Sequence, residues 1–171
     1  VELIHHGTPS GIDNTVIVYE QAVFFVRDKP IEILHNHADL RILIADTGKK
    51  ALTKVAVGDV RKLYEANRDT IYPVLSAIGD LVTIAREAMH AGDVVQLGQL
   101  MTKNHKLLQD LTVSSDELDY LVAQAMDAGA YGAKLSGGGR GGNMIALVDD
   151  RTVSDVKASL LGAGAKRVFE T

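Results

Sequence analysis

The sequence predicts an α+β domain in which helices cover one face of an antiparallel sheet. Three observations support this fold class. Short β-rich segments come first, a long stretch with helical periodicity follows, and the last third alternates between strand and helix. With 171 residues, of which 46% are apolar, the chain is long enough to bury one hydrophobic core.

The N-terminal part is expected to be a breaker-rich loop, residues 5–14, followed by strands. Segments rich in β-branched and aromatic residues predict these strands, and the last of them is mostly apolar and therefore expected to be buried. The polar segment 46–50 ends this β region. The predicted strands are Thr15–Tyr19, Ala22–Arg27, Ile31–Leu34 and Leu40–Ala45.

The middle of the chain repeats apolar residues at helical spacing, with breakers and caps between the repeats. Tyr72-Pro73 is expected to end the first helix, because a proline disfavours helical backbone at the residue before it. Ser114–Glu117 has the pattern of a capping box. The predicted helices are 57–64 with Thr53 as a fair N-cap, 74–89 ending at Gly92, 94–111 capped by Asp93, and a fourth from the capping box to Gly129.

The last third is expected to be a strand, a glycine loop, a strand, a helix and a strand. Asp150 can cap the short helix, which would end at Gly162. The three predicted strands are Tyr131–Leu135, Asn143–Val148 and Lys166–Glu170, with the glycine loop at 137–142.

Composition excludes several classes of function. A net charge of −4 argues against a nucleic-acid or acidic-membrane partner, and no apolar run approaches the roughly 20 residues that cross a bilayer. The absence of cysteine excludes disulfides and thiol chemistry and favours a reducing compartment, so we expect a cytoplasmic protein. The chain begins at Val1, without methionine or a signal peptide, and we interpret it as a fragment.

The histidines do not predict a metal site, because their spacing gives no compact ligand set. His35, His37, His90 and His105 are expected to be ordinary polar residues, whereas His5 and His6 adjoin the motif described below.

The glycine loop Ser136-Gly137-Gly138-Gly139-Arg140-Gly141-Gly142 is the first motif that carries chemistry. Successive backbone N–H groups without Cβ obstruction can bind a phosphate, and Arg140 adds a positive charge; the alternative is a flexible surface turn. The spacing G-x-G-x-x-G does not indicate a dinucleotide site here, because a strand follows instead of a helix. No Lys-Ser/Thr pair follows for a P-loop, and the protein-kinase motifs His-Arg-Asp and Asp-Phe-Gly are missing.

Two weaker motifs lie upstream. Pro9-Ser10-Gly11-Ile12-Asp13-Asn14 places Asp13 in a constrained turn, where its carboxylate can take a proton from a substrate hydroxyl or serve as a helix cap or turn acid. Thr47-Gly48 and Thr53-Lys54 could hold an anionic substrate, or could simply begin a helix.

Together these motifs resemble the GHMP kinases, and within that superfamily most closely the mevalonate kinase family. Residues 6–14, His-Gly-Thr-Pro-Ser-Gly-Ile-Asp-Asn, are similar to the signature H-G-x-P-S-G-x-D-N, and residues 134–142 are similar to K-L-T-G-A-G-G-G-G. Thr53-Lys54 resembles the Thr-Lys/Arg element before a long helix. Ser136, Gly138 and Arg140 depart from the usual Thr, Ala and Gly, and Asn143 stands where a Cys is frequent.

The resemblance implies transfer of the γ-phosphate of ATP to the primary hydroxyl of mevalonate, with ATP and Mg²⁺ as cofactors. Asp13 would be the general base or would orient the hydroxyl, and His6, Ser10 and Thr53 would shape the substrate side. The metal would be held mostly by an N-terminal half that this chain lacks, so no metal ligand is expected here. The nucleotide phosphates would contact Ser136, Gly137, Gly138, Gly139, Arg140, Gly141 and Gly142.

The resemblance also implies a domain division. Residues 1–39 would end an N-terminal kinase domain, and residues 40–171 would form the C-terminal domain, a ferredoxin-like antiparallel sheet with added helices. The family's other glycine-rich element, P-x-x-x-G-L-G-S-S-A, is absent, so the fragment is expected to be inactive alone. The alternatives are another GHMP kinase, acting on phosphomevalonate or homoserine, or a non-catalytic module that dimerises or regulates; a homodimer is compatible with each.

Overall fold

The computed structural model describes residues 12–34, 40–50 and 52–171, except for the side chains of Asp13 and Asn14. Its main sheet has four antiparallel strands in the order β4-β5-β3-β6. Along the chain these strands and two helices follow one another as β3, α6, β4, β5, α7 and β6, which is the ferredoxin-like arrangement and confirms the α+β class. Their bounds are β3 Arg41–Asp46, α6 Asp116–Asp127, β4 Gly132–Ser136, β5 Asn143–Val148, α7 Val153–Gly162 and β6 Arg167–Glu170.

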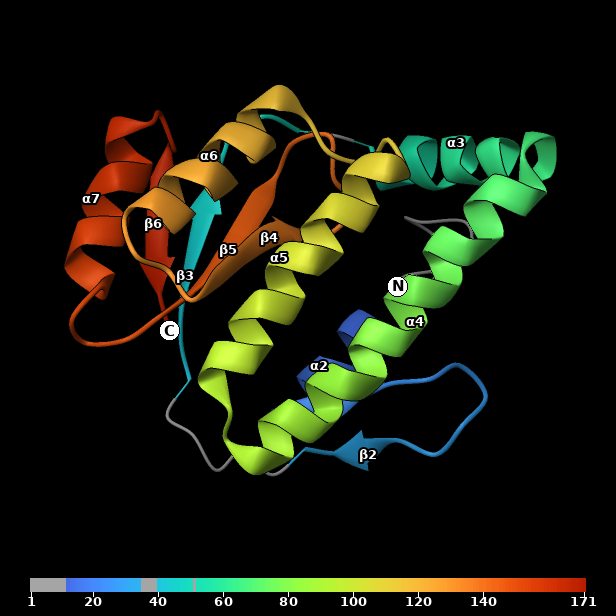
Figure 1. The fold of residues 1–171 in the computed structure, drawn as a ribbon, viewed down its shortest axis with the longest axis horizontal. Coiled ribbons are helices and arrows are strands. Elements are labelled where there is room, and N and C mark those ends of the chain that lie inside the picture. The colour runs from blue at the N-terminus through green and yellow to red at the C-terminus, as the bar shows by residue number, and fades with distance from the viewer. Residues whose placement is uncertain (1–11, 35–39, 51) are drawn as a thin grey trace.

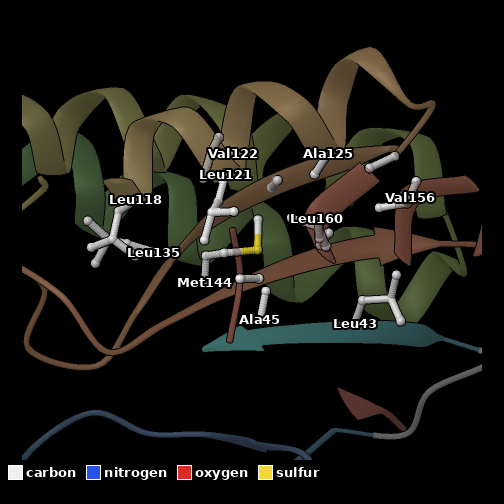
Figure 2. Packing of buried hydrophobic residues seen from close by; sticks show 14 of the residues in the cluster. Leu43, Ala45, Leu118, Leu121, Val122, Ala125, Leu135, Met144, Val156 and Leu160 are labelled. Carbon is white, nitrogen blue, oxygen red and sulfur yellow. The ribbon is translucent and has the colours of Figure 1, made fainter. Parts of the chain in front are cut away.

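The hydrophobic core lies between this sheet and the pair α6 and α7 (Figure 2). Alternate residues of a strand point to opposite faces, and in β3 it is Leu43 and Ala45 that are fully buried. Figure 2 shows Ala45 beside Met144 of β5, and Leu43 on the side of Val156 and Leu160 of α7. Ser115 begins α6 as its N-cap, accepting a hydrogen bond from the Leu118 N–H, as the capping-box pattern predicts.

Three helices are inserted between β3 and α6, namely α3 Thr53–Ala66, α4 Arg68–Ala91 and α5 Val94–Asp110. The chain reverses between α4 and α5 because Gly92 adopts a left-handed conformation, φ 68°, and the Asp93 carboxylate caps the next helix at Gln96 N. The two helices therefore run side by side (Figure 1). α5 packs directly on the edge strand β4, where Gly98 and Gly132 meet backbone to backbone.

The N-terminal segment forms α2 Ile12–Tyr19 and a small hairpin of β1 Val23–Phe24 and β2 Glu32–Ile33. The hairpin lies against α4, whose Arg86 contacts Glu32 at 3.4 Å and covers the Phe24 ring at 5.1 Å from its centre. In the described part of the chain, no helix combines the length and the apolar content that crossing a membrane requires.

Two predicted elements were wrong. Thr15–Tyr19, predicted as a strand, lies in α2; β-branched residues disfavour a helix only weakly, so the local context decided. Pro73 does not end a helix but is the sixth residue of α4, which continues through it in spite of the one backbone hydrogen bond that a proline removes. The break falls instead at Asn67, which separates α3 from α4.

Two predicted caps were also wrong. Thr53 is the first residue of α3, and the preceding Leu52 is its N-cap without a side-chain bond. Asp150 does not cap α7, whose N-cap is Thr152. Asp149 instead binds the backbone at the start of this helix, because its Oδ1 accepts a hydrogen bond from the Thr152 N–H at 3.0 Å. The other predicted helices and strands are present, with boundaries shifted by a few residues or, in the hairpin, shortened.

Candidate functional site

The glycine loop connects β4 to β5 and turns through backbone conformations that side chains rarely adopt. Gly137, Gly139, Gly141 and Gly142 have φ values of 84°, 74°, 132° and 73°, and Arg140 between them has 58°. Only glycine takes such values without strain. The loop is therefore a specified structure and not an arbitrary tether between two strands.

Three separate segments hold this loop in place. A Cβ added at Gly138 would lie 2.6 Å from Thr53 Oγ1, and one at Gly141 would lie 2.9 Å from the Lys49 carbonyl oxygen. A Cβ at Gly139 would collide with the carbonyl oxygen of Val113, in the connection between α5 and α6. Close packing thus adds to the backbone requirement for glycine at Gly139 and Gly141, and at Gly138 it alone favours glycine.

The backbone N–H groups of the loop divide into two sets. Arg140 N–H donates to the Val113 carbonyl and Gly142 N–H to the Lys49 carbonyl, each at 2.8 Å. Gly139 N–H closes the hydrogen-bonded turn over residues 137–138. Among the described residues, the N–H groups of the other glycines in the loop have no hydrogen-bond acceptor. Clustered free N–H groups in such a turn form an anion-binding nest. The donors left free are Gly137, Gly138 and Gly141.

Thr53 lies at the edge of this nest, although the two are far apart in sequence. It begins α3, so the positive end of the helix dipole is beside the loop. The fold thus brings together two of the sequence-predicted groups, Thr53 and the glycine loop. His6 and Ser10 lie outside the described residues, and so does the side chain of Asp13, whose backbone is in the first turn of α2.

A basic hollow of about 740 Å³ adjoins the other end of the loop, at Gly142 and Asn143. Asp46 within it accepts from Arg167 Nη2 at 2.7 Å, and this contact holds the pKa of Asp46 below its ordinary value. Lys49 pairs with Glu117. The cations that line the hollow are Lys49, Lys50, Lys166 and Arg167, so positive charge exceeds the single carboxylate of its lining. An anion near Gly142 would be attracted here.

A buried histidine forms a hydrogen bond to the strand that leads into the loop. His105 of α5 is only 4% exposed, and its Nδ1 accepts a hydrogen bond from the Leu135 N–H at 3.2 Å. The proton of the neutral ring is therefore on Nε2, which lies 3.0 Å from Asp119 Oδ1 but is not aligned for a hydrogen bond. Burial lowers the pKa of His105, and the nearby Asp119 carboxylate opposes that shift.

Lys134 is a second residue whose surroundings the sequence did not reveal. Its amine donates to the Leu135 carbonyl at 2.9 Å, and burial lowers its pKa. It lines a cavity of about 180 Å³ between α4, α5 and β4, whose other walls are mostly apolar.

A signal for His105 does exist in the sequence, since His105 shares the helical spacing of Met101 and Leu108.

Among the described residues, no group of three or more His, Asp or Glu side chains is arranged to hold a metal ion.

Comparison with known proteins agrees with this geometry. The family described as "GHMP kinases C terminal" matches residues 85–166. A mevalonate kinase from Pyrococcus horikoshii is 39% identical over 158 residues, covering 88% of this chain and 46% of that protein. A mevalonate kinase from Thermococcus sibiricus is 38% identical over 169 residues, covering 96% of this chain and 50% of that protein. The chain thus spans about half the length of these curated relatives.

Solved structures show the same fold. The structure of L. major mevalonate kinase in complex with R-mevalonate aligns with a TM-score of 0.93 and 33% identity, covering 99% of this chain and 54% of that one. The S. pneumoniae phosphomevalonate kinase, in complex with phosphomevalonate and AMPPNP, aligns with a TM-score of 0.80 at 20% identity, which speaks for the fold alone. The match of the C-terminal domain, together with similarity to mevalonate kinases along most of this chain, shows that the chain belongs to the GHMP kinase superfamily.

Proposed function

We propose that this chain supplies one side of the active site of an ATP-dependent mevalonate kinase, which converts mevalonate to 5-phosphomevalonate. The observation that carries the proposal is the nest of free N–H groups, from Gly137, Gly138 and Gly141, beside Thr53 at the start of α3. Such a nest suits a phosphate group, and the structural relative at 33% identity was solved with R-mevalonate.

The predicted site residues would bind phosphate, transfer a proton and position the substrate. Ser136 and the glycines would make up the phosphate-binding side, in the loop that also contains Arg140. Asp13, at the start of α2, would take the proton of the primary hydroxyl of mevalonate. The hydroxyl oxygen would bond to the γ-phosphorus while the bond from that phosphorus to the bridging oxygen of ATP breaks, so that ADP leaves. Thr53, His6 and Ser10 would position mevalonate. Rate enhancement then comes from positioning and electrostatics.

The proposal extends to the whole protein in three ways. Residues 1–39 end a first kinase domain, and residues 40–171 form the second. We expect Mg²⁺ and most of the ATP contacts to be provided by a half of the protein that corresponds to the part of the relatives this chain does not match. We place the protein in the cytoplasm, in keeping with its lack of cysteine.

The test joins this chain to the half of the P. horikoshii relative that it does not match, and measures ADP release with ATP and one acceptor at a time. Mevalonate should give turnover in the usual kinase range of about 1–100 s⁻¹. The same measurement with phosphomevalonate and homoserine addresses the other GHMP kinases. Faster turnover with either of those than with mevalonate would contradict the substrate assignment.

A second candidate, a non-catalytic module that dimerises, is favoured by the surface of α2. Ile17 and Val18 are 71% and 76% exposed, and Val16 and Tyr19 beside them are exposed as well. A surface of this kind is typical of an association site. Sedimentation together with ATP titration separates the two functions: a dimer without nucleotide affinity favours the module, and a monomer with measurable affinity favours the kinase half.

A further inference from the structure

The only cation of the glycine loop is engaged with protein groups. Arg140 Nη1 lies 2.6 Å from Asp59 Oδ2 on α3, and Nε donates to the Thr112 carbonyl at 3.0 Å. Nη2 makes a third contact, 3.4 Å from Thr112 Oγ1. The guanidinium thus joins three segments: the loop, α3, and the connection between α5 and α6.

The backbone of Arg140 is held as firmly as its side chain. Its N–H donates to the Val113 carbonyl, and its φ of 58° is unusual for a residue with a Cβ. A glycine would adopt this conformation more easily, and glycine is the residue that the resembled motif carries here. The contacts of the side chain give a reason for arginine at this position in spite of the backbone cost.

The partner of Arg140 lies on the helix that begins with Thr53. Gly138 packs on Thr53, and Arg140 pairs with Asp59 further along α3, so the loop is joined to this helix at two points. The contact with Arg140 also lowers the pKa of Asp59 from its ordinary value, so Asp59 remains charged at neutral pH. Side-chain exposures of 31% for Arg140 and 37% for Asp59 keep the pair partly shielded from water.

We propose that Arg140 is a positioning residue, which holds the glycine loop against α3 so that the free N–H groups and Thr53 face one phosphate-bearing ligand together. On this account Arg140 favours nucleotide binding through the shape of the loop and through its pair with Asp59, not through contact with a phosphate. The identity of the ligand rests on the proposed function; the coupling of loop and helix does not.

The coupling is tested by hydrogen exchange of backbone amides in the chain itself. In Arg140→Gln and in Asp59→Asn, the amides of Arg140 and Gly142 should exchange about two- to fivefold faster, the range for losing one partly exposed ion pair. The double variant should exchange no faster than either single one. Arg41→Gln is the matched control, since it breaks a 2.7 Å pair with Asp150 at the far end of β3. Unchanged exchange at both loop amides, or additive effects, would overturn the coupling.

The role in binding is tested by titrating ATP into the same variants and following the amide resonances of the glycine loop, which reports weak affinities as well. Both Arg140→Gln and Asp59→Asn should raise Kd by about two- to fivefold. Direct contact between Arg140 and a phosphate predicts the opposite for Asp59→Asn, because removing a nearby carboxylate should leave binding equal or tighter. That result would overturn the positioning role. If ATP shifts no resonance in the unaltered chain, the phosphate nest of the proposed function fails, while the exchange measurement still decides the coupling.

Discussion

The Leu135 N–H donates to His105 Nδ1 across 3.2 Å, and the glycine loop follows one residue after Leu135. A buried imidazole that accepts a backbone bond must stay neutral on that nitrogen. The last strand residues before the loop thus depend on the protonation state of a helix residue 30 positions away in sequence.

We therefore predict that the free energy of unfolding falls as the pH is lowered from about 7 to 5. Burial holds the pKa of His105 below its ordinary value of 6.5, so the unfolded chain takes up a proton before the folded chain does. The stabilisation is complete above pH 6.5 and is lost below it. Two charged groups act on the ring: Asp119 favours its protonation, and Lys134 disfavours it.

Urea unfolding of His105→Gln at several pH values measures this effect. The variant should be less stable at pH 7 and should show a smaller loss of stability on acidification. His90→Gln is the control, because His90 is a partly exposed residue of α4 beside Glu32. An identical pH slope in His105→Gln and the unaltered chain would contradict the prediction.

The contact between α5 and β4 gives a prediction for packing. Gly98→Ala should destabilise the protein by about 1–3 kcal/mol or more, because the new Cβ collides with the backbone carbonyl of Tyr131. Gly79→Ala is the matched control in the neighbouring α4, where nothing lies within 4 Å of the new methyl group. It should stabilise by about 0.5–1 kcal/mol, as alanine favours a helix. Equal midpoints of urea unfolding for both variants would show that the close approach is not required.

Much of the fold follows from local signals, and the errors arise where local signals are weak. β5 was predicted to the residue because it is a continuous apolar run between a glycine loop and an aspartate. Gly92 and Asp93 were identified as stop and cap from residue type alone. Thr15–Tyr19 was misassigned because runs of β-branched residues favour strands only slightly.

The sequence predicted the glycine loop of the candidate site, but it did not predict which residues pack against the loop. The glycine composition locates the loop and suggests an anion, since that depends on local backbone freedom. The partners of the loop are set by tertiary structure: Asp59 is 81 residues from Arg140, and Lys49 and Val113 are also distant from it in the chain. His105 was predicted to be an ordinary polar residue from its residue type, although its helical spacing from Met101 and Leu108 places it on the side of α5 that packs against the rest of the protein.

Within the loop, two glycines should respond differently to the same substitution. Gly137 has open space around it, so Gly137→Ala should cost about 1 kcal/mol or less from its positive φ and should mainly weaken nucleotide binding. Gly139→Ala should lower the melting temperature as well, because its Cβ meets the Val113 carbonyl. Calorimetry and ATP titration on both variants make the comparison. If the loop were a purely structural turn, Gly137→Ala and Gly139→Ala would each weaken nucleotide binding only in proportion to their loss of stability.

Replacement of Asp13 tests the catalytic assignment in the joined protein used for the ADP-release assay. Asp13→Asn should lower kcat by roughly 10²–10⁴, with a much smaller change in the KM for mevalonate, because a positioned base acts in the transition state. Asp28→Asn, in the exposed turn between β1 and β2 with φ 62°, is the control; asparagine tolerates that conformation. If Asp13→Asn kept more than half of the rate, the base would have to be another residue.

The 171 residues by themselves should fold but should not turn over ATP and mevalonate. Folding is expected because one continuous core joins β3, β4 and β5 to α6 and α7, with α3, α4 and α5 packed around it. Turnover is not expected because the nest covers only one side of a transferring phosphoryl group, and phosphoryl transfer depends on groups that hold the triphosphate in line with the hydroxyl from both sides. Circular dichroism with a cooperative melting transition checks the first part, and ADP release with and without mevalonate checks the second. Mevalonate-dependent release by the chain alone, at about 1 s⁻¹ or more, would show that this half contains a complete phosphoryl-transfer site.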